Sequence, residues 1–270
     1  MAEHDVILGE ESIDSLVEKV RIDSVSDIFR AALNMKHIAG VRGMRVGLCD
    51  NIASGRPMTD EFGTNVNADI LGWEGNIDAW LNDPCVALHS PMPQACRFLG
   101  EPFWSNRRGF HGCPPNPYLD QFDLDRFFTG KIKNYAVMMV PVHLPFGQIS
   151  ANSFNPVDLS VGDLSLQISK YGKLFESITR RFISDYVNVS YNLSGIANHC
   201  TLSKREVECL TWAARGKTDS EAAQIIDISG STVRFHIVNA SKKLGSTNRA
   251  QSIFKATQLG YLKTSFRHLH

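Results

Sequence analysis

The chain has 270 residues but no apolar run of roughly eighteen residues, the length that a membrane-spanning helix needs. Its first residues, MAEHD, lack the basic cluster that begins a secretion signal. The six cysteines include no C-x-x-C pair, and a secreted disulfide framework would require regular cysteine spacing. We therefore expect reduced, mostly buried thiols in a cytoplasmic protein that neither crosses nor enters a membrane.

The chain also lacks the sequence motifs of common catalytic sites. It contains no G-x-S-x-G, no phosphate-binding P-loop and no H-E-x-x-H. His111 and Cys113, even with His89 and Cys96, have spacings that match no standard structural zinc site. We expect no enzyme, no metal and no cofactor.

An excess of charge of either sign is missing as well, since 28 Lys and Arg balance 28 Asp and Glu. The balance is uneven along the chain. From Ser190 to His270 there are eleven Lys and Arg against five Asp and Glu, a net charge of +6, which leaves −6 on the rest. This asymmetry is typical of a nucleic-acid-binding module joined to an acidic domain.

The basic part, from Leu202 to Tyr261, predicts four short helices. Each helix begins at a residue able to cap it, and a glycine stands at three of the ends. A tight turn at Asp227 and Ile228 joins the second and third helices, which is a helix-turn-helix pattern. The expected caps are Ser203 with Glu206, Thr218 with Glu221, and Ser229, and the expected stops are Gly216, Gly245 and Gly260.

The third of these helices carries the functional prediction. Val233, Ile237, Ala240 and Leu244 form its apolar stripe, and the opposite face holds polar and basic residues able to contact base edges and phosphates. A small helical bundle with a solvated charged face is the alternative interpretation. The predicted DNA-contacting residues are Lys217, Thr218, Ser231, Thr232, Arg234, Phe235, Val238, Asn239, Lys242, Lys243 and Arg249.

This stretch resembles the DNA-binding domain of LuxR-type (GerE-type) transcription regulators, without a gap over about sixty residues. Two positions depart from the family pattern. Asp227 stands where the family usually has Gly, and Asp tolerates the left-handed backbone that such a turn requires. Val238 stands where Lys or Arg is common, which removes one contact to DNA. The matching features are Leu202, Arg205-Glu206, Leu210, Gly216-Lys217, Ala223, Ile228-Ser229, Thr232-Val233, His236, Lys243-Leu244 and Asn248 to Ala250.

The order of elements before the basic part predicts an α+β fold, an α-β-α sandwich on an antiparallel sheet. It is joined to the all-α helix-turn-helix domain of four helices. The boundaries are a ligand-sensing domain over 1–189, a linker over 190–200 and the DNA-binding domain over 201–270. Helices are predicted at 12–20, 25–37, 67–86, 119–128 and 164–189, strands at 44–49, 57–62, 96–99, 135–144 and 148–154, and a loop at 106–118.

The first domain resembles the ligand-binding half of quorum-sensing LuxR-type regulators, through the Asp83-Pro84 step, Glu101-Pro102 and the stretch VPVHLPFGQISANSF. The resemblance implies that Asp83 bonds the amide of an acyl-homoserine lactone and that Ser153 bonds its acyl carbonyl. Two aromatic residues of the family pattern are replaced, by Ile70 and Glu74, which favours a different small molecule. The predicted ligand-binding residues are Trp73, Trp80, Asp83, Trp104 and Ser153; the alternative places the tryptophans in the core.

Two classes of function remain open at this stage. The first is a DNA-binding transcription regulator controlled by a small molecule and acting as a homodimer on double-stranded DNA. The second is a ligand-free scaffold that tethers a partner protein to DNA. An apolar cavity near Asp83 and Ser153 would favour the first, and a filled core there would favour the second.

Overall fold

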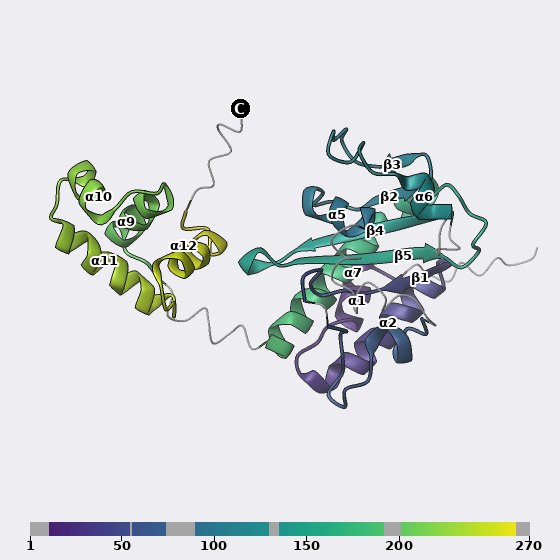
Figure 1. Cartoon of the computed structure of the whole chain (residues 1–270). Helices are drawn as coiled ribbons and strands as arrows, with labels where there is room; N and C mark the ends of the chain where they lie inside the picture. The colour runs from purple at the N-terminus through teal and green to yellow at the C-terminus, as the bar shows by residue number, and fades with distance from the viewer. Residues whose placement is uncertain (1–10, 55, 74–89, 130–134, 192–200, 263–270) are drawn as a thin grey trace, which may run out of the picture. The chain divides into compact units, whose positions relative to one another are not determined.

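The computed structural model describes residues 11–54, 56–73, 90–129, 135–191 and 201–262. The chain divides into two compact units, one made of nearly all residues as far as Tyr191 and the other mainly of residues from 192 on (Figure 1). Within the described residues, no helix has the length and apolar character that crossing a membrane requires.

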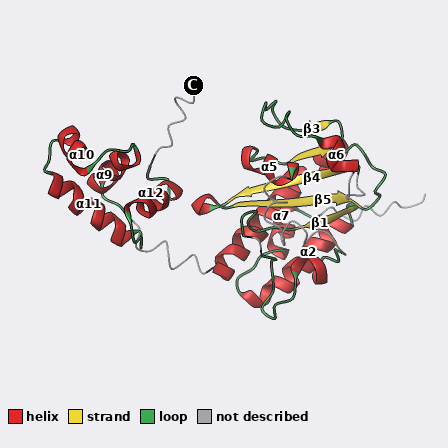
Figure 2. Ribbon diagram, in the orientation of Figure 1, coloured by secondary structure: helices red, strands yellow, loops and turns green. Residues whose placement is uncertain are grey.

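A five-stranded antiparallel sheet lies at the centre of the first unit (Figure 2). Its two long strands correspond to the two adjacent apolar runs of the sequence, and both are buried over most of their length because helices cover both faces. In spatial order the strands are β1 (Met44–Gly47), β5 (Ile149–Pro156), β4 (Ala136–His143), β2 (Phe103–Asn106) and β3 (Gly109–His111).

The two faces of the sheet carry different helices, which makes the first unit an α-β-α sandwich, as predicted. Phe154 of β5 stacks on Phe175 of the long helix α7 (Ser165–Tyr191), with 4.2 Å between ring centroids. Helices α1 (Ile13–Lys19) and α2 (Ile28–Gly40) pack with α7. Helix α5 (Pro91–Phe98) and helix α6 (Leu124–Thr129) contribute to the core on the other face.

The aromatic stripe of α7 belongs to this core. Phe175, Phe182 and Tyr186 are buried within the unit, and the Tyr186 hydroxyl accepts a hydrogen bond from the Thr59 amide at 3.0 Å. An aromatic stripe on a long helix could cover both a sheet and a partner molecule. Here the surface of the three buried residues is used inside the domain.

Three local predictions in the first unit are wrong. Residues 96–99 lie at the end of helix α5, which begins with Pro91 at a position where a missing N–H costs nothing. Residues 57–62 form no strand and contribute one isolated bridge, Thr59 to Asn65. Strand β3 lies inside the predicted loop 106–118.

The helix predicted over 67–86 is described only in part. Residues 66–70 form a π-helical turn, and residues 74–86 lie outside the described ranges.

The second unit contains the four predicted helices, α9 (Lys204–Ala214), α10 (Asp219–Ile226), α11 (Gly230–Lys243) and α12 (Arg249–Gln258). Both predicted capping boxes form, and Ser229 and Asn248 cap α11 and α12. The helices enclose one apolar core, because each carries its apolar residues on a single face. Its buried members include Leu202, Leu210, Ala222, Val233, Ile237, Ala240, Leu244 and Ala256.

Asp227, in the turn between α10 and α11, has a left-handed backbone with φ of 53°. Since a Cβ atom is strained in this conformation, we expect Asp227→Gly to stabilise the second unit by about 0.5–1 kcal/mol. Asp227→Ala should destabilise it, because Ala enters this region less readily than Asp. Hydrogen exchange of α10 and α11 in the full chain would measure both changes, and equal effects of the two variants would show that the turn stores no strain.

Candidate functional site

Helix α11 presents two contrasting faces. Val233, Ile237 and Ala240 are buried in the core of the second unit. On the opposite side, Phe235 is 61% and Val238 is 45% exposed, although both are apolar. The helix has 14 residues and is therefore about 21 Å long, which suits it to lie in the major groove of DNA.

Arg234 is a highly accessible basic residue of this helix, with 77% of its side chain exposed. Its Nε donates a hydrogen bond to Oδ2 of Asp219 at 3.2 Å. Within the described residues, the two terminal nitrogens of the guanidinium make no hydrogen bond. Paired N–H groups of this kind match the O6 and N7 acceptors of guanine.

Other residues predicted to contact DNA have partners inside the domain. Arg249 donates to Asp219 and, at 2.7 Å, to the carbonyl of Lys217. Lys243 donates to Glu206 at 2.8 Å. Thr218 caps α10. Arg249 and Lys243 thus link different helices, and Thr218 acts within α10. By contrast, Ser231 and Lys242 are exposed on α11, and Thr232 and Asn239 are partly exposed there.

Glu206 is a buried carboxylate, only 4% exposed. Burial raises its pKa, but the hydrogen bonds from Lys243 and from the Ser203 amide outweigh burial and hold the pKa below its ordinary value of 4.5. A carboxylate with a lowered pKa stabilises the fold at pH above its unfolded value, and this contribution is lost as the pH falls through the lowered value.

We expect Lys243→Met to destabilise the second unit by about 1–2 kcal/mol, because it leaves Glu206 without its cation. Lys242→Met, at the exposed neighbour, should change stability by less than about 0.5 kcal/mol. Urea denaturation at pH 7 and at pH 3 would test this. The loss caused by Lys243→Met should shrink at the lower pH, and a loss independent of pH would contradict the role given to the Glu206 charge.

The residues predicted to bind a ligand do not all line one site. Trp73 donates from Nε1 to the Val46 carbonyl at 2.6 Å, and its ring lies 4.4 Å from the Arg45 guanidinium. Arg45 pairs with Asn155 of β5, and Ser153 is two residues from Asn155 on the same strand. Arg45 and Ser153 therefore lie on the same face of the sheet. The structure therefore brings Trp73 and Ser153 to one side of the sheet, near the β1 edge.

Trp104 lies on the other face. It pairs with Met138, and Met138 pairs with Phe154, which stacks on α7. Trp104 is buried and stacks on His111, with 4.1 Å between centroids. Trp104 and Ser153 therefore cannot line one cavity, and Trp80 and Asp83 lie outside the described ranges.

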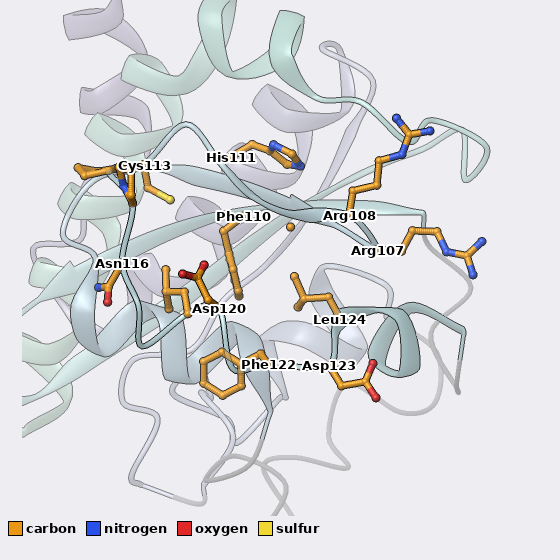
Figure 3. A pocket seen from close by; sticks show the side chains of 14 residues that line it. Arg107, Arg108, Phe110, His111, Cys113, Asn116, Asp120, Phe122, Asp123 and Leu124 are labelled. Carbon is orange, nitrogen blue, oxygen red and sulfur yellow. The ribbon is translucent and has the colours of Figure 1, made fainter.

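The middle of the Ser153 face is filled by a core cluster that includes Cys96, Phe103, Val137 and Met139. Beyond this cluster, at the β3 edge, an open cavity of about 540 Å³ lies between the β2–β3 hairpin and residues 113–124 (Figure 3). Figure 3 shows Arg107 and Arg108 at one end, Cys113 and Asn116 at the other, and Phe110 and Phe122 between them. The sequence prediction missed this cavity because its lining comes from residues 107–124, which were interpreted as a loop followed by a helix.

Of the residues considered for a metal site, His89 lies outside the described ranges. Burial raises the pKa of Cys49 to about 12 and also raises that of Cys96, so both thiols are protonated at neutral pH. In the parts of the chain that the structure describes, no three His, Cys, Asp or Glu side chains gather closely enough to hold a metal ion.

Residues 200–256 match the family described as bacterial regulatory proteins, luxR family. The transcriptional activator VanR of Vibrio anguillarum is 38% identical over 123 residues, which are 46% of this chain and 50% of VanR. The transcriptional activator LuxR of Aliivibrio fischeri is 46% identical over 74 residues, 26% of this chain and 30% of LuxR.

The chain thus spans half or less of the length of these curated relatives. The crystal structure of Escherichia coli SdiA aligns with 92% of this chain and 97% of its own, at 17% identity and a TM-score of 0.49. The capped helices α9 to α12 and the match over residues 200–256 together show that this part of the chain is a domain of the luxR family of bacterial regulatory proteins.

Proposed function

We propose that the chain is a transcription regulator that binds double-stranded DNA through helix α11. The exposed face of α11 carries the proposal. It combines a guanidinium whose terminal nitrogens have no partner among the described residues, two exposed apolar side chains able to contact thymine methyl groups, and Lys242 at the end of the helix. A ligand-free scaffold tethered to DNA would use the same face of α11, so the two functions differ in the ligand and not in this helix.

Positive charge in the same unit supports this proposal. The net charge of +6 from Ser190 onward supplies the attraction to phosphates on which most affinity for DNA depends. Lys217 and Lys242 are proposed phosphate contacts, while Arg249 and Lys243 contribute by fixing the helices that carry the interface. A regulator acting on the genome of a bacterium is expected in the cytoplasm.

Selection of bound duplexes from a random DNA pool tests the proposed function. The full chain should enrich a shared sequence, and its affinity for that sequence should exceed its affinity for a scrambled duplex by about 10³-fold or more. Equal affinity for both duplexes, at several salt concentrations, would show that α11 does not discriminate between bases. Any binding that remained would then be electrostatic only.

We further propose that a small molecule bound to the first unit controls this activity. Trp73 and Ser153 lie on one face of the sheet, and the β3-edge cavity lies within the range of sizes typical of small-molecule sites. Asp83 keeps the role that the family resemblance implies, and Trp80 stays a predicted ligand-binding residue. Native mass spectrometry of the purified chain would reveal a retained compound, and its absence would favour the ligand-free scaffold.

The effect of Ser153→Ala on a bound compound would distinguish the two locations. If the compound lies near β1, this variant should reduce its stabilisation of the fold, whereas Phe122→Ala should not. The reverse pattern would place the compound in the β3-edge cavity. Equal stabilisation of both variants and of the unmodified chain would exclude both locations.

A homodimer is the third part of the proposal. Phe254 of α12 is 61% exposed, although it is a large apolar residue. One helix-turn-helix contacts only a few base pairs, so operators commonly pair two half-sites about 34 Å apart. Sedimentation of the free chain at micromolar concentration should show a dimer that Phe254→Ser dissociates; a monomer under all conditions would leave pairing to the DNA.

A further inference from the structure

Asp219, the first residue of α10, lies between two arginines that belong to other helices. One oxygen of its carboxylate accepts the bond from Arg234 Nε on α11, at 3.2 Å. The other accepts a bond from Arg249 at the start of α12, which is itself fixed to the Lys217 carbonyl. Arg249 therefore fixes the carboxylate of Asp219, and the carboxylate in turn fixes the guanidinium of Arg234.

The geometry of this contact suits recognition of a base. Arg234 uses Nε, so both terminal nitrogens stay available for a pair of parallel hydrogen bonds to an acceptor such as guanine. A free arginine side chain would have to give up its rotamer freedom on binding, and a side chain already held at Nε has less to lose.

We infer that Asp219 is a positioning residue that determines sequence specificity by orienting the guanidinium of Arg234. This inference rests on the proposed binding of DNA by α11. The carboxylate also offsets one of the positive charges beside the interface, and it therefore limits attraction to DNA of any sequence. Asp219 should raise discrimination between sequences at the cost of overall affinity.

The test compares the affinity of the full chain for its selected duplex and for a scrambled duplex of the same composition. Asp219→Ala should tighten binding to the scrambled duplex by up to about fivefold and steepen its salt dependence by about 0.9. The ratio of the two affinities should fall by about fivefold or more, because Arg234 loses its orientation. In the Arg234→Ala background, Asp219→Ala should leave this ratio unchanged.

Arg249→Gln is the matched control, since it removes the other arginine from the same carboxylate and leaves the contact with Arg234. It should lower stability and the affinity for both duplexes while keeping their ratio. If Asp219→Ala instead weakens both duplexes in parallel, or keeps the ratio of the unmodified chain, Asp219 has only a structural role and the inference is overturned.

Asp219→Asn keeps an acceptor for one arginine and should lower the ratio less, which provides a second measurement if Asp219→Ala folds poorly. If the unmodified chain binds both duplexes equally, the proposed function fails together with this inference. If the unmodified chain discriminates between the two duplexes, and both Asp219 variants discriminate as well as it does, only the inference fails.

Discussion

Arg234→Ala should weaken binding to the selected DNA site by about 1–3 kcal/mol, roughly 5- to 150-fold. Arg234 is highly exposed on α11, and its terminal nitrogens are free to make two parallel hydrogen bonds. Truncation to alanine removes both bonds and leaves the helix intact, because Arg234 is exposed on the flank of the buried stripe that holds Val233 and Ile237. A gel-shift titration with the selected duplex would measure the loss.

Lys242→Ala is the control for this experiment. Lys242 lies on the exposed side of α11, near its C-terminal end, where we expect a phosphate. Its removal should weaken binding to selected and scrambled duplexes alike and lower the salt slope by about one. If Arg234→Ala behaved as Lys242→Ala does, Arg234 would contact only the phosphate backbone.

Phe175→Ala should destabilise the first unit by about 3–5 kcal/mol. The ring is completely buried and stacks on Phe154 across the contact between α7 and the sheet. Alanine would leave a cavity beside Phe154. The residues around it cannot move in to fill it, because the rest of strand β5 and of helix α7 holds them in place. Hydrogen exchange should show lost protection in peptides from β5 and α7.

Phe29→Ala gives the comparison for this variant. Phe29 lies on α2 but is about half exposed, so its truncation should cost less than about 1 kcal/mol. Peptides from α11 serve as an internal control, since its core is formed by residues of the second unit. If Phe175→Ala and Phe29→Ala cost the same, the stacked pair would not be central to the sandwich.

The second unit could be predicted from sequence nearly residue by residue because its signals are local. Ser203 with Glu206, and Thr218 with Glu221, lie one turn apart, and a capping box needs nothing from outside its own helix. The exposed face of α11 followed from the spacing of its buried stripe. Asp219 was missed as a positioning residue because its contacts with Arg234 and Arg249 span 15 and 30 residues.

The first unit was predictable only in outline, since its sheet depends on distant pairings. Strand β1 lies beside β5, about one hundred residues later, and β4 lies beside β2. Short apolar runs such as residues 96–99 suit a helix or a strand equally well. Trp104 and Ser153 lie on opposite faces of the sheet because of the register between strands β2, β4 and β5. The number of residues between Trp104 and Ser153 in the sequence does not reveal this register.

Contact between Arg234 and a base in the major groove can be measured by removing one acceptor atom from the DNA. Each guanine of the selected site would be replaced in turn by 7-deazaguanine, which lacks N7, and affinities would be measured for the unmodified chain and for Arg234→Ala. At one position, the replacement should weaken binding to the unmodified chain by about fivefold or more and leave binding to Arg234→Ala unchanged. If every replacement affects both proteins equally, Arg234 contacts no guanine N7, and base recognition by α11 through this residue is contradicted.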